Sequence, residues 1–200
     1  MARTVNKRPQ KSPVVTVIGE GLTEQFYFKH IRSLFNFRYV IKPYYFGVTS
    51  LYEMDRKIAG VLDGGGIAVC VFDADVAHRD EAERKKLCSL FRKYGNKESV
   101  VFCHSLPSIE YWFLLHFRNT NRGFRDSQDV EGELGKYMEA YEKSSKFLED
   151  ERWVEDLCKR NKLGTALDRA RNFGDSGQSY TNIYKAFEVF RYRDGSQLSR

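Results

Sequence analysis

The sequence predicts an α/β fold in which a parallel β-sheet is flanked by helices and followed by a helical C-terminal extension. Three observations favour this class. The chain has 200 residues, 42% of them hydrophobic, which is enough for one domain with a substantial core. Buried strand patterns alternate with amphipathic helical patterns up to residue 117, and only helical patterns continue beyond Arg118. Such alternation is typical of parallel sheets with right-handed crossovers and helices on both faces.

The first elements surround a glycine turn. Val14–Ile18 is apolar or β-branched throughout, which predicts a buried strand that ends at the turn Gly19–Gly21. The apolar residues that follow recur at helical spacing and predict a helix over Thr23–Phe35. Tyr39–Phe46 is aromatic and β-branched, so we expect a strand, placed at a sheet edge because Pro43 interrupts it.

The alternating region then continues through two more strands. Ser50 and Glu53 match a capping box, which begins a helix that ends before Gly64. The other predicted elements are a buried strand at Ile67–Phe72, a charged helix at Asp80–Lys93, a buried strand at Ser99–Cys103 and an apolar helix at Ile109–Phe117 with Pro107 in its first turn.

The segment after the alternating region contains helical patterns alone. Asn119–Ser127 is polar and predicts a loop at a boundary. The helical patterns cover Asp129–Tyr141, Lys146–Cys158, Gly164–Phe173 and Thr181–Phe190, with Thr181 as N-cap of the last. We therefore expect a disordered basic leader (1–12), an α/β core (13–117) and a helical extension packed on that core (118–200).

Composition limits the function classes. The formal net charge of +6 is compatible with nucleic-acid binding without requiring it. No apolar stretch approaches the roughly 20 residues that a membrane span needs, so we expect no membrane partner. The four cysteines have no C-x-x-C spacing, which indicates a reducing, cytoplasmic setting and no zinc site.

Acidic residues follow two of the predicted strands. Glu20 follows the first strand, and Asp73 and Asp75 follow the third, where they would alternate along an extended tip and point the same way. Ligands of open parallel sheets bind beyond the carboxyl ends of the strands, so these acids converge if the two strands are neighbours. Crowded carboxylates repel one another, and a divalent cation reverses that cost. Glu20, Asp73 and Asp75 are therefore the predicted metal-binding residues, with Mg²⁺ or Mn²⁺ as the ion.

Two further acids and one basic cluster are candidates of a second rank. Glu24 either joins the metal site or only favours the start of its helix. Glu110 lies in the first turn of an apolar helix and is expected to face the site rather than water, although a helix-dipole role would also explain it. The candidate nucleic-acid-binding residues, which could equally form a solvated helix face, are Lys159, Arg160, Lys162, Arg169 and Arg171.

Four segments resemble a known family. They are I-G-E-G-L-T-E-Q-F-Y-F (18–28), V-F-D-A-D (71–75), S-L-P-S-I-E-Y-W-F-L-L-H-F (105–117) and Y-T-N-I-Y (180–184). A strand ending in Glu and a later strand ending in D-x-D resemble the Toprim catalytic domain, and the set as a whole is closer to the RloB-like proteins, a Toprim-related group. The chain departs from the family pattern at Gly19, where cysteine is frequent, and at Leu106, where asparagine is frequent.

The resemblance implies a Toprim-like, Rossmann-like core and a metal-dependent nuclease that acts on DNA or RNA in anti-phage defence or restriction, often beside an ABC-type ATPase. Glu20, Asp73 and Asp75 would then be the catalytic residues: Asp73 and Asp75 would hold the metal, and Glu20 would bind metal or act as general base. One alternative is a non-catalytic nucleic-acid-binding or docking subunit of the ATPase complex. Another is a phosphatase with an aspartyl nucleophile in F-D-A-D, but Val76-Ala77-His78 follows where such enzymes usually have Gly-Thr.

Overall fold

The computed structural model describes residues 13–42, 50–75, 77 and 80–194 and contains one five-stranded sheet. The strands, in the order β2-β1-β3-β4-β5, are β2 (Tyr39–Lys42), β1 (Val15–Gly19), β3 (Ile67–Asp73), β4 (Val100–Leu106) and β5 (Tyr180–Thr181). The first four strands are parallel and β5 runs antiparallel to β4. The predicted α/β class and the edge position of the second strand are confirmed.

The register brings the carboxyl ends of the central strands to one edge. Gly19, the last residue of β1, pairs with Val71 of β3. Asp73, the last residue of β3, pairs with Ser105 of β4. The first and third strands are therefore neighbours, as the convergence of the predicted site residues requires.

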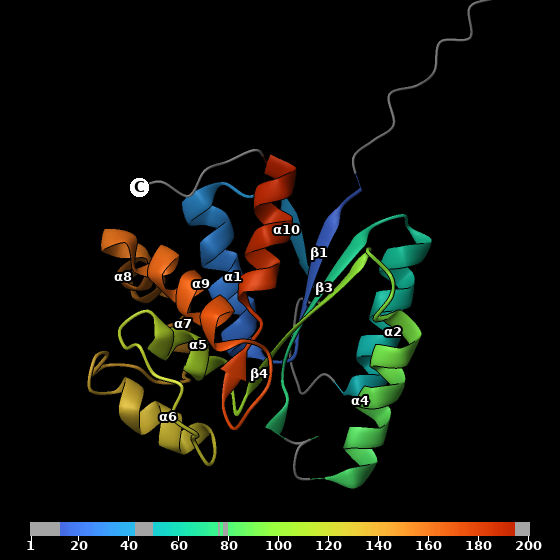
Figure 1. The fold of residues 1–200 in the computed structure, drawn as a ribbon. Helices are drawn as coiled ribbons and strands as arrows, with labels where there is room; N and C mark the ends of the chain where they lie inside the picture. Colours follow the sequence, from blue (N-terminus) through green and yellow to red (C-terminus); the bar gives the residue numbers. More distant parts are fainter. Residues whose placement is uncertain (1–12, 43–49, 76, 78–79, 195–200) are drawn as a thin grey trace, which may run out of the picture.

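Helices cover both faces of the sheet (Figure 1). α2 (Leu51–Asp63) and α4 (Glu81–Tyr94) lie on one face, and α1 (Leu22–Phe35) and α10 (Tyr184–Asp194) lie on the other. The other helices whose bounds the structure describes lie on the side of α1 and are α5 (Ile109–Leu115), α6 (Ser127–Leu134), α7 (Ser145–Glu149), α8 (Arg152–Cys158), the 3₁₀ turn η1 (Lys159–Asn161) and α9 (Lys162–Phe173). Within the described residues, no helix has the length and apolar character needed to cross a membrane.

Alternation along the strands supplies two hydrophobic cores. In β3, Val69 and Val71 belong to the core shared with α1 and α5 to α10, whereas Ala68 and Cys70 belong to the core under α2 and α4. The first core is the larger and is rich in aromatic rings, including Trp112, which is fully buried. A strand buried on both faces is apolar at every position, which explains why β3 was predicted within one residue of its observed end.

The region after Arg118 differs from the prediction in two respects. Thr181 does not cap a helix but pairs with Ser105 in β5, where their hydroxyl oxygens lie 2.8 Å apart. The expectation that strands stop after residue 118 was therefore wrong. The helix predicted over Lys146–Cys158 is two helices, because Asp150 has an extended backbone conformation between α7 and α8.

Several predicted boundaries also moved. α6 ends at Leu134, and Gly135 follows as its C-cap, so the segment up to Tyr141 is not continuous helix. α5 begins after Ser108 as N-cap, which places Pro107 ahead of the helix rather than in its first turn. The predicted basic leader and the second half of the strand predicted over Tyr39–Phe46 lie outside the described residues.

Candidate active site

Glu20 and Asp73 meet at the carboxyl edge of the sheet. Glu20 is the residue after β1, and Asp73 is the last residue of β3. The Glu20 Oε2 atom accepts a hydrogen bond from the backbone N–H of Asp73 at 2.8 Å. The two residues were predicted at the ends of different strands, and the Glu20 carboxylate contacts the backbone of Asp73 directly.

Asp73 also connects the sheet to the start of α5. Its Oδ1 atom accepts a hydrogen bond from the backbone N–H of Ile109 at 2.8 Å, which brings the neighbouring Glu110 to the same edge. Glu110 is fully buried, and its Oε2 atom accepts a hydrogen bond from the Ser108 hydroxyl at 2.6 Å. The expectation that Glu110 faces away from water is confirmed.

Glu24 lies in the first turn of α1, beside Glu20. Its Oε2 atom accepts a hydrogen bond from the backbone N–H of Gly21 at 2.9 Å, so it does support the start of the helix. A Cβ on Gly19 would lie 3.2 Å from the Glu24 Cβ, and one on Gly21 would lie 3.1 Å from Glu24 Oε2. The two glycines thus leave the space in which Glu24 packs, and we refer to Glu20, Glu24, Asp73 and Glu110 as the acidic cluster.

Asp75 takes a different position from the one predicted. The backbone N–H of Ala74 donates to Ser105 O at 2.8 Å, and the chain then turns, so that Asp75 is helical rather than extended. The prediction that Asp73 and Asp75 alternate along a straight tip was therefore wrong. Asp75 is still close enough to the acidic cluster for its negative charge to raise the pKa of Glu20.

The acidic cluster is electrostatically costly. Burial, followed by the charge of Asp75, raises the pKa of Glu20 to about 7, although the hydrogen bond from Asp73 opposes the rise. Burial and then the charges of Glu20 and Glu110 raise the pKa of Glu24 to about 7. Burial also raises the pKa of Asp73 well above its usual range, and its three carboxylate neighbours add to the effect. Crowded, desolvated carboxylates of this kind are typical of functional sites.

Two residues that sequence reasoning missed hold Glu110 from the extension. The Tyr141 hydroxyl donates to Glu110 Oε1 at 2.7 Å, and Lys143 Nζ lies 3.0 Å from the same oxygen and 2.8 Å from Glu131 Oε1. Burial and the charge of Glu110 raise the pKa of Tyr141. Lys143 also counteracts the rise in the pKa of Asp73. No local motif marks either residue, because both lie in the irregular segment between α6 and α7.

The predicted basic cluster lies on η1 and α9, and most of its members have partners within the chain. Lys159 Nζ is 2.8 Å from Asp156 Oδ1, and Arg171 Nε is 3.1 Å from Glu188 Oε1. Arg169 Nη1 donates to the Leu115 carbonyl at 2.7 Å, at the opposite end of α5 from Glu110. The other two are Lys162, whose ammonium lies over the Phe117 ring, and Arg160, which is exposed. The structure thus does not bring these cations into contact with the acidic cluster.

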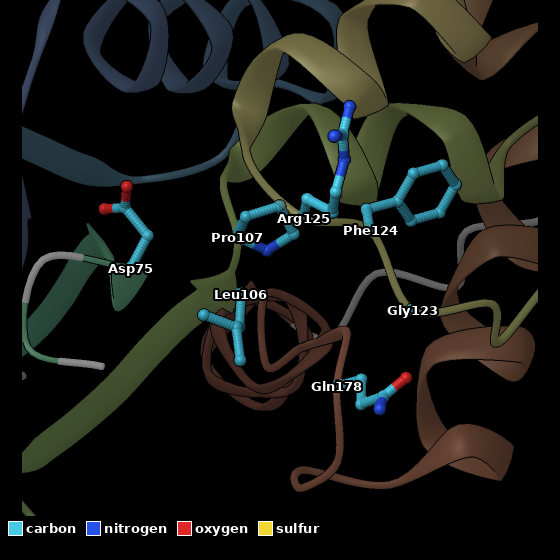
Figure 2. A pocket seen from close by; sticks show the side chains of 7 residues that line it. All are labelled: Asp75, Leu106, Pro107, Gly123, Phe124, Arg125 and Gln178. Carbon is cyan, nitrogen blue, oxygen red and sulfur yellow. The ribbon is translucent and has the colours of Figure 1, made fainter. Parts of the chain in front are cut away.

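A pocket of about 290 Å³ adjoins Asp75 (Figure 2). Leu106, at the end of β4, and Pro107, which leads into α5, line it. The other residues that line it are Gly123, Phe124, Arg125 and Gln178. We refer to it as the Asp75 pocket.

The chemistry of the acidic cluster suits a hard divalent cation, since every donor is a carboxylate oxygen and a cation would offset the burial and mutual repulsion that raise the pKa values of Glu20, Glu24 and Asp73. As the side chains stand, however, no group of three or more His, Cys, Asp or Glu residues within the described part of the chain is arranged to hold a metal ion. The backbone bonds to Glu20 and Asp73 each use one of the two carboxylate oxygens, so an ion would have to compete with those N–H groups or use the other oxygen.

Comparison with known proteins gives one match. A family model described as RloB-like protein matches residues 15–189. Neither the curated proteins nor the solved structures contain a match.

Proposed function

Because the chain belongs to the RloB-like family, we propose that it is a metal-dependent phosphodiester hydrolase, a nuclease of Toprim type acting on DNA or RNA. The observation that carries the proposal is the acidic cluster: carboxylates from the ends of β1 and β3 and the start of α5 lie at the edge where open parallel sheets bind ligands. The pKa values of Glu20, Glu24 and Asp73 are raised, and strongly raised pKa values of this kind cluster at functional sites. They therefore support a catalytic or metal-binding role for these acids.

Glu20, Asp73 and Asp75 would hold Mg²⁺ or Mn²⁺, with Glu24 and Glu110 as supporting acids. When bound, such an ion lowers the pKa of water and offsets charge on a phosphate. Glu20 alternatively accepts the proton of the attacking water, for which a pKa of about 7 is well matched to neutral pH. Tyr141 and Lys143 keep Glu110 oriented and partly neutralised from the side of the extension.

The biological setting is part of the proposal. We infer a cytoplasmic protein of anti-phage defence that works beside an ABC-type ATPase, on the basis of the family resemblance. The four cysteines are free thiols, which supports a reducing compartment.

Cleavage of end-labelled DNA and RNA with Mn²⁺ or Mg²⁺, in the presence of the neighbouring ATPase, tests the activity. We expect Glu20→Gln and Asp73→Asn each to reduce turnover at least about 100-fold. Glu24→Gln should cost less, because its hydrogen bond to Gly21 serves the helix start. Glu81→Gln, on the exposed start of α4, is the matched control. Undiminished cleavage by Asp73→Asn would rule out the proposed site.

A non-catalytic nucleic-acid-binding or docking subunit is the second candidate. Two observations favour it. Backbone N–H groups donate hydrogen bonds to Glu20 and Asp73, and no three His, Cys, Asp or Glu side chains among the described residues are arranged to hold a metal ion. Calorimetric titration with Mn²⁺ separates the two functions. Binding that is lost in Asp73→Asn supports the enzyme, and no binding to the wild type supports the subunit.

A further inference from the structure

The Asp75 pocket lies between Asp75 and the loop that begins the extension. Figure 2 shows Asp75 on one side and Phe124 and Arg125 on the other, with Pro107 between them. Asp75 is the residue that links the pocket to the acidic cluster, since its charge acts on Glu20. A ligand in the pocket would therefore extend towards the edge where the acids converge.

The side of the pocket formed by Gly123, Phe124 and Gln178 is fixed by contacts within the chain. Phe124 is buried, and its backbone N–H donates to the Ser179 hydroxyl at 2.9 Å. Gly123 packs closely on Gln178. The approach leaves no room for a side chain at Gly123, since a Cβ there would lie 2.2 Å from the Gln178 Oε1 atom. Two segments far apart in the sequence are thus joined on one side of the pocket, and a binding surface that is already formed loses less entropy on binding.

Arg125 supplies the positive charge. Arg122 in the same loop is paired with Asp129 at 3.0 Å, and its guanidinium lies 4.5 Å from the centre of the Phe124 ring. The Arg125 backbone N–H also bonds Asp129, at 3.3 Å. Arg125 itself is exposed, and among the described residues its guanidinium has no ion pair with an acid. In contrast to Lys159 and Arg171 it is therefore available to an external anion.

The ligand class follows from size and charge. A volume of about 290 Å³ lies at the lower end of the range of small-ligand pockets, roughly 300–1,000 Å³, so it fits one nucleotide unit rather than paired strands. A guanidinium is the side chain best matched to a phosphate, and the Gln178 amide adds a donor and an acceptor for a sugar or base. In the metal-free protein Asp75 would repel a phosphate placed against it, which assigns the bound phosphate to the Arg125 side.

We propose that the Asp75 pocket binds one nucleotide of a single nucleic-acid strand, with Arg125 contacting a phosphate and Gln178 contacting the attached sugar or base. This assignment rests on the proposed function for the choice of nucleic acid as ligand. It names a substrate-binding surface that differs from the basic cluster on η1 and α9.

Fluorescence anisotropy with labelled single-stranded DNA and RNA oligonucleotides, on the full chain in EDTA, tests binding without cleavage. We expect Arg125→Gln to weaken binding at low salt and to reduce the slope of log affinity against log salt by about 0.7, the value for one lost contact to a single strand. Gln178→Ala should weaken binding without changing the slope. Arg84→Gln is the control, because it removes the same charge from the exposed surface of α4 on the other face of the sheet.

The outcomes separate this inference from the nuclease proposal. Weaker binding by Arg125→Gln with unchanged binding by Arg84→Gln supports the pocket, even if the protein cleaves nothing. Equal affinity and equal slope in wild type and Arg125→Gln overturn it, even if metal-dependent cleavage is observed. Equal losses in both arginine variants also overturn it, since the effect would then be one of net charge. A preference for the DNA or the RNA probe identifies the natural strand.

Discussion

Replacing Glu20 with glutamine removes one ionisable group from the acidic cluster and leaves its main contact intact. The glutamine Oε1 atom can accept the hydrogen bond that the Asp73 N–H donates to Glu20 at 2.8 Å. The variant therefore isolates the cost of the negative charge. We expect it to change how the stability of the metal-free protein depends on pH.

The sign follows from the raised pKa. In the unfolded chain Glu20 loses its proton near its ordinary pKa of 4.5, whereas in the folded protein it keeps the proton up to about 7. The folded state therefore binds more protons over this window, and the wild type loses stability as the pH rises through it. The shift corresponds to about 3 kcal/mol at most, and solvent screening at the sheet edge lowers the expected loss to about 1–3 kcal/mol.

Urea unfolding in EDTA at about pH 4 and pH 8, on either side of the window, measures the effect. We expect Glu20→Gln and the wild type to have similar stability at the lower pH and the variant to be more stable by about 1–3 kcal/mol at the higher pH. Adding Mn²⁺ at the higher pH should stabilise the wild type more than the variant. Glu81→Gln, which lies outside the acidic cluster, should follow the wild type. If Glu20→Gln also runs parallel to the wild type at both pH values, the electrostatic reasoning is wrong.

Two other predictions concern contacts that the tertiary structure creates. Lys143→Met should destabilise the protein by about 1–2 kcal/mol in urea unfolding, because the fully buried Glu110 loses its nearest cation while Lys143 itself is partly exposed. Tyr27→Phe should cost about 1–3 kcal/mol in the same assay, because the buried indole N–H of Trp112 donates to the Tyr27 hydroxyl at 2.8 Å and would lose that acceptor.

Each of these variants has a matched control. Lys136→Met removes a cation from Glu133, which keeps Arg118 as a second partner, so we expect the smaller loss from that change. Tyr52→Phe removes a hydroxyl from a side chain that is 78% exposed and should be nearly neutral. A loss from Lys143→Met no larger than that from Lys136→Met would contradict the role assigned to Lys143. Equal effects of Tyr27→Phe and Tyr52→Phe would contradict the role assigned to Tyr27.

The tertiary structure alone decided how the site is completed. β5 has two residues and exists because Thr181 pairs with Ser105, which is 76 positions away in the sequence, so no local pattern could predict it. Lys143 reaches Glu110 from an irregular segment whose path depends on how α6 and α7 pack. Arg125 and Asp75 line the same pocket because the loop after α5 returns to the edge of the sheet.

The sequence by itself determined the central strands and the placing of the acids at their ends. β1 and β3 are buried on both faces, so their apolar runs mark them without knowledge of their neighbours. Glu20 and Asp73 could be predicted as partners because the carboxyl ends of adjacent parallel strands share one edge. Asp75 was misplaced because the turn after Asp73 depends on a hydrogen bond to Ser105 of another strand. Strand identity is a local consequence of burial, whereas the orientation of a side chain beyond a strand end depends on contacts that only the folded chain makes.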